Sequence, residues 1–207
     1  MLRVGLTGGI ACGKSLVARF FRERGVPVVD DDQAARDAVA PGTPGLAAVV
    51  AEFGEGVLLH DGTLDRAALG RTIFADDRLR RRLMNATFPF IGQLVVDRIA
   101  AAERSGSPIV VYESALLVEN GQVEAWRPLV VVTTSPELQR ARLCARNALT
   151  PEQADDRIRS QMPLAEKVAR ADYVIENAAS EAAARARFDE VFSALEQRAR
   201  RGDAPSQ

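Results

Sequence analysis

The segment that most limits how this chain can fold is a glycine-rich stretch directly behind its first apolar run. Residues 8–15 read Gly-Gly-Ile-Ala-Cys-Gly-Lys-Ser and match the pattern G-x-x-x-x-G-K-[ST]. Such a stretch turns a strand into a helix, and its glycines let backbone N–H groups converge on phosphate oxygens. Lys14 adds a charge for the β- and γ-phosphates, and Ser15 is placed to ligate Mg²⁺. The segment predicts a nucleoside triphosphate site made by Gly8, Gly9, Ala11, Cys12, Gly13, Lys14, Ser15 and Leu16.

The rest of the chain alternates short apolar runs with longer stretches of helical periodicity. The runs are rich in Val, Ile or Leu, as buried parallel strands are, and span 2–7, 26–29, 109–112, 129–133 and 173–175. Such alternation is typical of a parallel sheet covered by helices. We therefore expect an α/β fold, a P-loop NTPase-type parallel sheet of about five strands flanked by helices.

The segment between the second and third runs is far longer than an ordinary connection. We expect residues 30–106 to form a helical insert, with a hairpin-like turn at 60–62 and helices from 65 to about 104. Asp65 and Asp76 are expected helix caps, and Pro89 is expected to break or kink the last long helix. A cluster of arginines is typical of a solvated helix face: Arg78, Arg80, Arg81 and Arg82.

Two further helical segments complete the predicted organisation. Residues 138–170 read as helical and are rich in arginine, and the last long helix spans about 180–201. The polar tail 202–207 is expected to be frayed. We expect one domain, 2–201, with a core made of 2–29, 107–134 and 171–201 and a lid at 135–170.

The charge balance limits the partners that this chain can bind. Lys and Arg number 27 against 28 Asp and Glu, and the net charge of −1 supplies no attraction for nucleic acid or an anionic membrane. The first residues lack the pattern of a secretory signal, and no apolar run approaches about 20 residues. We expect a cytoplasmic protein that acts on a small molecule, binds neither nucleic acid nor membrane, and needs no obligate protein partner.

The two cysteines, Cys12 and Cys144, have neither the spacing of a zinc site nor that of a disulfide framework, so both are expected to be free thiols. Cys12 lies beside Lys14 and a predicted helix N-terminus, surroundings that can lower the pKa of a thiol. Either Cys12 has a redox role or it is a small residue that the loop tolerates.

Acidic residues stand at the ends of two predicted strands. The second strand runs into Asp30, Asp31 and Asp32, and the third ends in Glu113. Ligands of open α/β sheets bind beyond the carboxyl ends of the strands. Phosphoryl transfer there needs one carboxylate as general base, and others, here Asp30 or Glu113, that organise Mg²⁺ through water. The alternative is that the aspartates form a solvated cap of the next helix.

Arginines follow the fourth predicted strand. Arg142 and Arg146 are four residues apart, so they share one face of a predicted helix. Guanidinium groups match the oxygens that carry charge during phosphoryl transfer, and a lid that carries them excludes water. We expect this pair to act in transfer; the alternative for each is an exposed helix face.

Ordered motifs extend over nearly the whole chain, about 2–200. They are V-G-L-T-G-G-I and G-K-S within 4–15, V-D-D-D-Q-A-A-R at 29–36, D-G-T-L-D-R at 61–66, L-L-V-E at 116–119, R-I-R-S-Q-M-P at 157–163 and K-V-A-R-A-D-Y-V-I-E-N at 167–177. In this order they resemble the dephospho-coenzyme A kinase family, whose D-x-D-x-x-A-R motif is similar to residues 30–36. A nucleotide loop alone occurs in many families, whereas this ordered set is specific.

The resemblance implies ATP-dependent phosphorylation of the ribose 3′-hydroxyl of dephospho-coenzyme A, with Mg²⁺, giving coenzyme A and ADP. It implies that Asp32 is the general base, that Lys14 and Ser15 hold phosphates and Mg²⁺, and that Asn177 lies on the adenine side of the nucleotide. The helical insert then binds the acceptor, with contacts from Asp32, Arg36, Glu113 and Gln161. Arg36 either meets the acceptor's phosphates or pairs with the aspartates.

The chain departs from the family pattern at several positions. Phe88 stands where members usually have histidine, and we expect it to pack within the acceptor lobe. Ala11 and Cys12 replace Gly-Ser, Leu16 replaces a small hydroxyl residue, and Ala115 replaces a proline. None of these changes removes a backbone group that binds phosphate.

Two other functions share parts of the pattern. A kinase for another small acceptor, such as a nucleoside monophosphate, has the same loop and arginine lid. A nucleotide switch couples hydrolysis to a change of shape without an acceptor, but the chain has no N-K-x-D guanine motif. The long insert favours an acceptor site over a switch.

Overall fold

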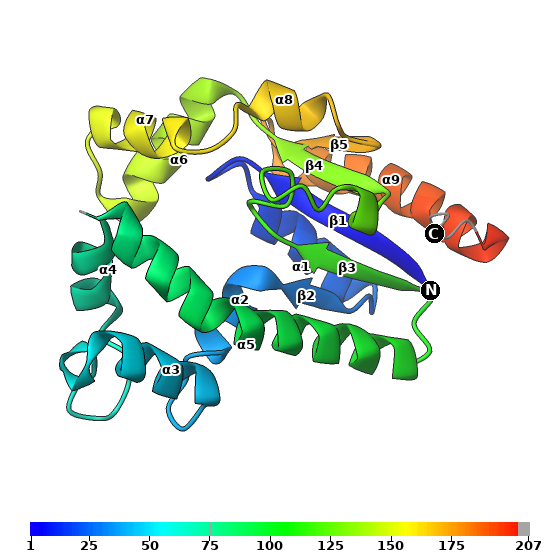
Figure 1. Ribbon diagram of the computed structural model, residues 1–207. Coiled ribbons are helices and arrows are strands. Elements are labelled where there is room, and N and C mark those ends of the chain that lie inside the picture. Colours follow the sequence, from blue (N-terminus) through cyan, green and yellow to red (C-terminus); the bar gives the residue numbers. More distant parts are fainter. Residues whose placement is uncertain (75, 203–207) are drawn as a thin grey trace. The chain divides into compact units, whose positions relative to one another are not determined.

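The structure, a computed structural model, describes residues 1–74 and 76–202. The chain forms two compact units, each with its own hydrophobic cluster (Figure 1). The sheet unit consists of Met1–Val29 together with the chain from Ala102 on, and the helical unit is Asp30–Ala101. The tail that we expect to be frayed lies, beyond Gly202, outside the described residues.

A five-stranded sheet has the order β2-β3-β1-β4-β5. β1 pairs in parallel with β3 and with β4, and β4 pairs in parallel with β5. The expected α/β fold is confirmed. The second strand lies at 28–30 rather than 26–29, because the Val26 N–H donates to the Phe21 carbonyl in the turn after the first helix. The strands are β1 (Leu2–Gly8), β2 (Val28–Asp30), β3 (Ile109–Glu113), β4 (Leu129–Thr133) and β5 (Tyr173–Glu176).

Five α-helices of the described residues lie in the sheet unit, and several begin at a serine or threonine cap. They are α1 (Lys14–Glu23), α6 (Pro136–Asn147), α7 (Pro151–Arg159), α8 (Leu164–Val168) and α9 (Glu181–Arg201), with a 3₁₀ turn, η2 (Glu124–Trp126). The helical unit contains α2 (Asp31–Asp37), α3 (Pro44–Phe53), η1 (Glu55–Val57), α4 (Arg66–Phe74) and α5 (Asp77–Arg104), which ends just past the boundary. Within the described ranges, no helix has the length and apolar character needed to span a membrane.

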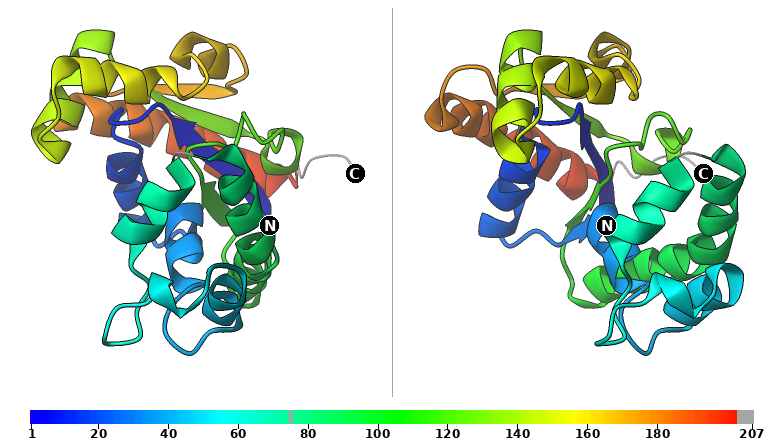
Figure 2. Two further views of the ribbon diagram at one scale, coloured as in Figure 1. Left: turned by 60° about the vertical axis from the view of Figure 1, so that its left-hand side comes forward. Right: turned by 90° about the vertical axis from the view of Figure 1, so that its left-hand side faces the viewer.

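The sheet is packed on both faces within its unit. Leu2, Val4 and Leu6 of β1 belong to an apolar cluster with residues of α1 and α9. Gly5 faces the other way, where a Cβ would lie 2.7 Å from the Trp126 carbonyl oxygen. Figure 2 shows α1 and α9 on one side of β1 and the segment after β3 on the other. This packing fixes the carboxyl end of β1, from which the glycine-rich loop continues.

The helical unit confirms several local expectations. The Asp65 and Asp76 carboxylates accept from first-turn N–H groups of α4 and α5 at 2.8 and 2.7 Å, so both are caps. An antiparallel bridge between Leu58 and Leu64 closes the hairpin-like turn. The four clustered arginines are exposed, as expected for a solvated helix face.

The structure decides three other expectations. α5 is one helix of 28 residues that contains Pro89, so no break occurs, and it bends along its length (Figure 1), in line with the alternative of a kink. Residues 138–170 are helical as expected, in three helices, because Ala148 adopts φ 51° and Pro151 and Pro163 stand at the starts of α7 and α8. The expectation for Phe88 is wrong, because the residue is 65 % exposed and does not pack within the lobe.

Replacement of Phe188 by alanine should destabilise the sheet unit by about 3–5 kcal/mol, the usual cost of deleting a buried aromatic ring. Phe188 is fully buried, with ring centroids 4.9 Å from Phe21 and 5.4 Å from Phe20. Urea unfolding followed by the fluorescence of the single tryptophan, Trp126, measures this change. Leu116→Ala, at a residue 44 % exposed, is the control and should change stability by about 0.5 kcal/mol. Equal losses in the two variants would contradict the packing described.

Candidate active site

The glycine-rich loop leaves the carboxyl end of β1 and ends at the N-terminus of α1. Gly13 precedes α1 at φ 97°, and a Cβ there would lie 2.0 Å from Asn177 Nδ2. A Cβ at Gly8 would lie 2.5 Å from the Val132 carbonyl oxygen. Only glycine allows these approaches, so β4 and the segment after β5 contact the loop backbone directly.

Three side-chain amides hold the loop in this shape. Gln161 Oε1 accepts from the Ile10 N–H at 2.8 Å, and Gln139 Nε2 donates to the Ile10 carbonyl at 2.8 Å. Asn177 Nδ2 donates to the Cys12 carbonyl at 2.9 Å. The protein's own contacts therefore fix the loop backbone on both sides of Ala11.

The start of α1 supplies donors for an anion. The N–H groups of Gly13, Lys14 and Ser15 have no acceptor among residues 1–74 and 76–202, as is usual in the first turn of a helix. The helix dipole makes the same end favourable for negative charge. Ser15 is exposed, so its hydroxyl is accessible to a bound ion. The geometry is that of a preformed phosphate-binding loop.

Lys14 pairs with a buried carboxylate at the end of β3. Its Nζ lies 2.8 Å from Glu113 Oε1, and only 2 % of the Glu113 side chain is exposed. Glu113 Oε2 lies 3.5 Å from Arg22 NH2 and accepts no hydrogen bond in the described part of the chain. The opposite charges offset each other's desolvation. Phosphates that draw Lys14 away would leave the Glu113 carboxylate in need of a new cation or donor.

Asn177 is bonded directly to the glycine-rich loop. Its N–H donates to the Thr133 carbonyl at 2.8 Å, its carbonyl accepts from Thr134 Oγ1 at 3.0 Å, and the residue is 7 % exposed. The family resemblance implies a place on the adenine side of the nucleotide, and in the structure the side chain bonds to the loop backbone. Its position therefore fits a residue that shapes the loop.

Gln139 and Lys167 are functional candidates that sequence reasoning missed. Gln139 is 5 % exposed on α6, four residues before the buried Leu143. A polar residue at a position where the helical period places an apolar one is the signal that could have identified it. Lys167 lies within residues 138–170, where the many arginines make a further cation inconspicuous in the sequence.

Lys167 is fully buried and joins α8 to the segment after β3. Its Nζ lies 2.7 Å from Glu119 Oε1 and donates to the Ala115 carbonyl at 2.7 Å. Glu119 Oε1 also accepts from the Met162 N–H at 3.2 Å, next to the loop-binding Gln161. A buried ion pair thus anchors the segment that holds the Ile10 N–H.

The two arginines expected to act together have different surroundings. Arg142 is half-buried, and its NH1 atom is buried without a hydrogen-bond partner in the described residues. Its charge acts on the Cys12 thiol, so it lies on the loop side of α6. Arg146 is exposed, and its Nε donates to Asn147 Oδ1 at 3.0 Å. Arg142 is therefore the arginine that α6 directs toward the loop.

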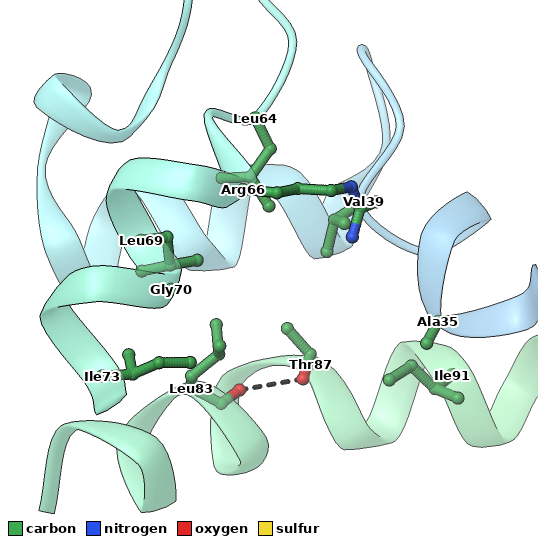
Figure 3. A pocket seen from close by; sticks show the side chains of 10 residues that line it. All are labelled: Ala35, Val39, Leu64, Arg66, Leu69, Gly70, Ile73, Leu83, Thr87 and Ile91. Carbon is green, nitrogen blue, oxygen red and sulfur yellow. Dashed lines mark hydrogen bonds between the residues drawn. The ribbon is translucent and has the colours of Figure 1, made fainter. Parts of the chain in front are cut away.

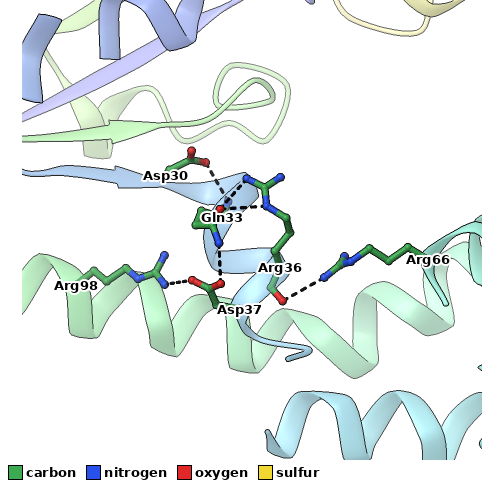
Figure 4. A network of polar contacts seen from close by, with 6 residues as sticks. All are labelled: Asp30, Gln33, Arg36, Asp37, Arg66 and Arg98. Atoms are coloured by element: carbon green, nitrogen blue, oxygen red, sulfur yellow. Dashed lines mark hydrogen bonds and ion pairs between the residues drawn. The ribbon is translucent and has the colours of Figure 1, made fainter. Parts of the chain in front are cut away.

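The acidic cluster after β2 belongs to the helical unit (Figure 4). Asp30 Oδ1 accepts from the Gln33 N–H at 3.0 Å and so caps α2, while Asp32 is exposed in the first turn. Arg36 donates from Nε and NH2 to Gln33 Oε1 at 3.2 and 3.0 Å. Arg36 is exposed, and its charge also acts on the Asp37 carboxylate of the same helix.

Cys12 does not have the lowered pKa that its neighbours suggested. The thiol is fully buried, and burial raises its pKa, although the Gly9 backbone, Arg142 and Lys167 act in the opposite direction. The desolvation of the thiolate outweighs these attractions. Cys12 is thus a small buried residue of the loop, and Cys12 and Cys144 are both free thiols.

A phosphate-binding loop between β1 and α1 of a parallel five-stranded sheet defines a P-loop nucleotide-binding protein. The fold is similar to that of shikimate kinase from Acinetobacter baumannii, with a TM-score of 0.52 and 17 % identity over 95 % of this chain and 94 % of that one. That likeness concerns the fold alone.

Closer similarities identify the family. A sequence model described as dephospho-CoA kinase matches residues 2–183. Dephospho-CoA kinase of Geobacter sulfurreducens is 45 % identical over 92 % of this chain and 96 % of its own length, and that of Anaeromyxobacter dehalogenans is 46 % identical over 93 % and 91 %. Dephospho-CoA kinase from Campylobacter jejuni superposes with a TM-score of 0.70, at 26 % identity over 94 % of this chain and 96 % of that one. The chain belongs to the dephospho-CoA kinase family.

Asn177→Ala should weaken ATP binding by roughly tenfold, because the buried Cys12 carbonyl loses its donor and the space beside Gly13 opens. Titration with a fluorescent ATP analogue measures the dissociation constant, and circular dichroism confirms that the variant is folded. Asn120→Ala, an exposed asparagine of the same unit, is the control. Equal affinity in the wild type and Asn177→Ala would show that the contact does not shape the loop.

Iodoacetamide should modify Cys144 in the folded protein and leave Cys12 unmodified. The thiolate is the reactive form, and burial raises the pKa of Cys12, so at alkaline pH this thiol is less ionised than an ordinary one. Peptide mass spectrometry after timed labelling, with and without urea, gives the rate at each cysteine. Rapid modification of Cys12 in the absence of urea would contradict its burial.

Proposed function

We propose that this protein transfers the γ-phosphoryl group of ATP to the ribose 3′-hydroxyl of dephospho-coenzyme A, giving coenzyme A and ADP in the cytoplasm. The observation that carries the proposal is the family match over residues 2–183, which includes the phosphate-binding loop. The acceptor oxygen forms a bond to the γ-phosphorus, the bond from that phosphorus to the β–γ bridging oxygen breaks, and the hydroxyl proton passes to a carboxylate.

The loop residues hold the donor nucleotide. The N–H groups of Gly13, Lys14 and Ser15 donate to phosphate oxygens, and Lys14 exchanges Glu113 for the β- and γ-phosphates. When bound, Mg²⁺ neutralises phosphate charge. The exposed Ser15 hydroxyl fits it as a ligand, with Asp30 or Glu113 acting through water. A site of this kind needs no cluster of protein carboxylates, and the described residues contain no group of three or more metal-binding side chains.

Asp32 is the proposed general base. It lies in the first turn of α2, two residues beyond the end of β2, and its side chain is exposed. An ionised carboxylate there can take the proton of the acceptor hydroxyl and hold the oxygen toward the phosphorus. Residues 30–106 form the acceptor-binding lobe, in which the guanidinium of Arg36 meets acceptor phosphates.

Segment 135–170 is the proposed lid. Arg142, with its unpartnered NH1, receives charge from the transferring group, and Arg146 joins it when the lid closes. Gln161 uses Oε1 for the Ile10 N–H, and its amide nitrogen is proposed to donate to the substrate. Glu113, released by Lys14, is proposed to contact the acceptor. Closure would exclude water, whose attack would hydrolyse ATP.

Coupling ADP release to an optical readout tests the proposal. Dephospho-coenzyme A should stimulate ADP release strongly, and AMP, UMP and shikimate should have little effect. Stimulation by AMP or UMP alone would indicate a nucleoside monophosphate kinase. A rate of ADP release that none of the acceptors changes would indicate a nucleotide switch and overturn the proposal.

Asp32→Asn should lower kcat by a factor of about 10² or more while ATP affinity stays near that of the wild type, because the amide cannot accept the proton. Steady-state kinetics with dephospho-coenzyme A give kcat, and nucleotide titration gives the affinity. Asp31→Asn makes the same change one residue earlier and should retain most activity. A large loss in Asp31→Asn with an unchanged kcat in Asp32→Asn would move the base to Asp31.

A further inference from the structure

The helical unit contains a pocket of about 240 Å³ between the end of α2, α4 and α5 (Figure 3). Its lining is mostly apolar, with Leu69 and Ile73 from α4 and Ile91 from α5. Arg66 supplies the single charged side chain of the lining. The pocket is smaller than the roughly 300–1,000 Å³ that drug-sized ligands occupy, so it admits one ring system and not a whole acceptor molecule.

Polar contacts hold the three walls of the pocket together (Figure 4). Arg66 NH2 donates to the Arg36 carbonyl at 3.1 Å and joins α4 to α2. Arg98 of α5 pairs with Asp37 of α2, whose other hydrogen bond comes from Gln33 Nε2 at 2.7 Å. The Arg98 hydrogen bond also lowers the pKa of Asp37, so this carboxyl group is ionised at neutral pH. These contacts join α2, α4 and α5, so the pocket is formed before a ligand binds.

The pocket and Asp32 share one face of α2. Asp32, Ala35 and Arg36 follow one another at i, i+3 and i+4, and Ala35 lines the pocket. At about 1.5 Å per residue, Ala35 lies roughly 4.5 Å along the helix from Asp32. A group in the pocket is therefore within about one helical turn of a hydroxyl bound at Asp32.

We propose that this pocket binds the purine base of the acceptor's adenosine. The inference rests on the proposed function, which places the ribose 3′-hydroxyl at Asp32. The base is bonded to that same ribose ring, whereas the pantetheine arm is separated from it by the diphosphate. The flat faces of a purine suit the apolar lining, and Arg66, at the end of α4 nearest α2, supplies a cation for its edge or for the adjacent phosphate.

Gly70 offers a way to fill the pocket without disturbing the fold. It lines the pocket from α4, and a Cβ added there would meet nothing within 4 Å. Leucine also favours helix more than glycine does. Gly92 on α5 is a matched control, because a Cβ there also meets nothing within 4 Å and the residue does not line the pocket.

The test compares Gly70→Leu and Gly92→Leu at saturating ATP. We expect Gly70→Leu to raise the KM for dephospho-coenzyme A by a factor of about 10 or more, because a buried ring contributes at least that much affinity. The inhibition constant of AMP, measured in competition with dephospho-coenzyme A, should rise by the same factor. The inhibition constant of 4′-phosphopantetheine, the KM for ATP and all values in Gly92→Leu should stay unchanged. A rise for 4′-phosphopantetheine alone would place the arm in the pocket, and unchanged constants would exclude the pocket from the site; either result overturns the proposal.

If the proposed function is wrong, the wild-type protein will not transfer phosphate to dephospho-coenzyme A. This result is distinct from a change of binding constants in the variants. In that case, calorimetric titration with AMP still tests whether the pocket binds a purine. A non-hydrolysable ATP analogue occupies the nucleotide loop during the titration. Binding that Gly70→Leu weakens and Gly92→Leu preserves supports a purine site. Binding that is equal in all three proteins, or absent, contradicts it.

Discussion

The contact between Asn177 and Gly13 is the constraint on which the nucleotide site depends. The amide lies so close that any Cβ at Gly13 would overlap it, and it donates to the neighbouring Cys12 carbonyl. Glycine at position 13 therefore allows both the left-handed backbone and the close approach of Asn177. Gln139 and Gln161 fix the loop at Ile10 in the same manner. Because these amides hold the loop, its remaining N–H groups can bind phosphate without a rearrangement of the backbone. The entropic cost of binding is therefore lower.

Two lysine–glutamate pairs in the sheet unit serve different purposes. Lys14 and Glu113 meet at the loop, and Lys14 keeps some exposure, so phosphates can compete for it. Lys167 is fully buried against Glu119 and the Ala115 carbonyl, so no ligand reaches it. Removal of one partner of such a buried pair strands a charge, at a cost of about 3–5 kcal/mol. The Lys14–Glu113 pair, whose lysine is partly accessible, thus suits exchange during binding, while the Lys167–Glu119 pair suits a permanent anchor for the segment that carries Gln161.

Much of the fold and of the nucleotide loop could be predicted from the sequence, because both rest on local signals. Apolar runs give the five strands, and G-x-x-x-x-G-K-S gives the loop with its helix. The sequence was a poor guide where tertiary contacts decide the outcome. Burial of Cys12 outweighs the effect of the nearby positive charges on its pKa, and Phe88 is exposed on α5 instead of packing within the lobe. Neighbours distant in sequence make Gln139 and Asn177 loop-holding residues, and no spacing rule connects them with Ile10 or Cys12.

The central claim is that the loop delivers a phosphoryl group to an acceptor hydroxyl and not to water. Phosphorus NMR of a mixture of the protein, ATP, Mg²⁺ and dephospho-coenzyme A tests this most directly, because it identifies where the γ-phosphorus goes. We expect the γ-phosphate resonance of ATP to disappear while ADP and a new phosphate monoester on the acceptor appear in equal amounts. Release of inorganic phosphate with the acceptor unchanged would contradict it.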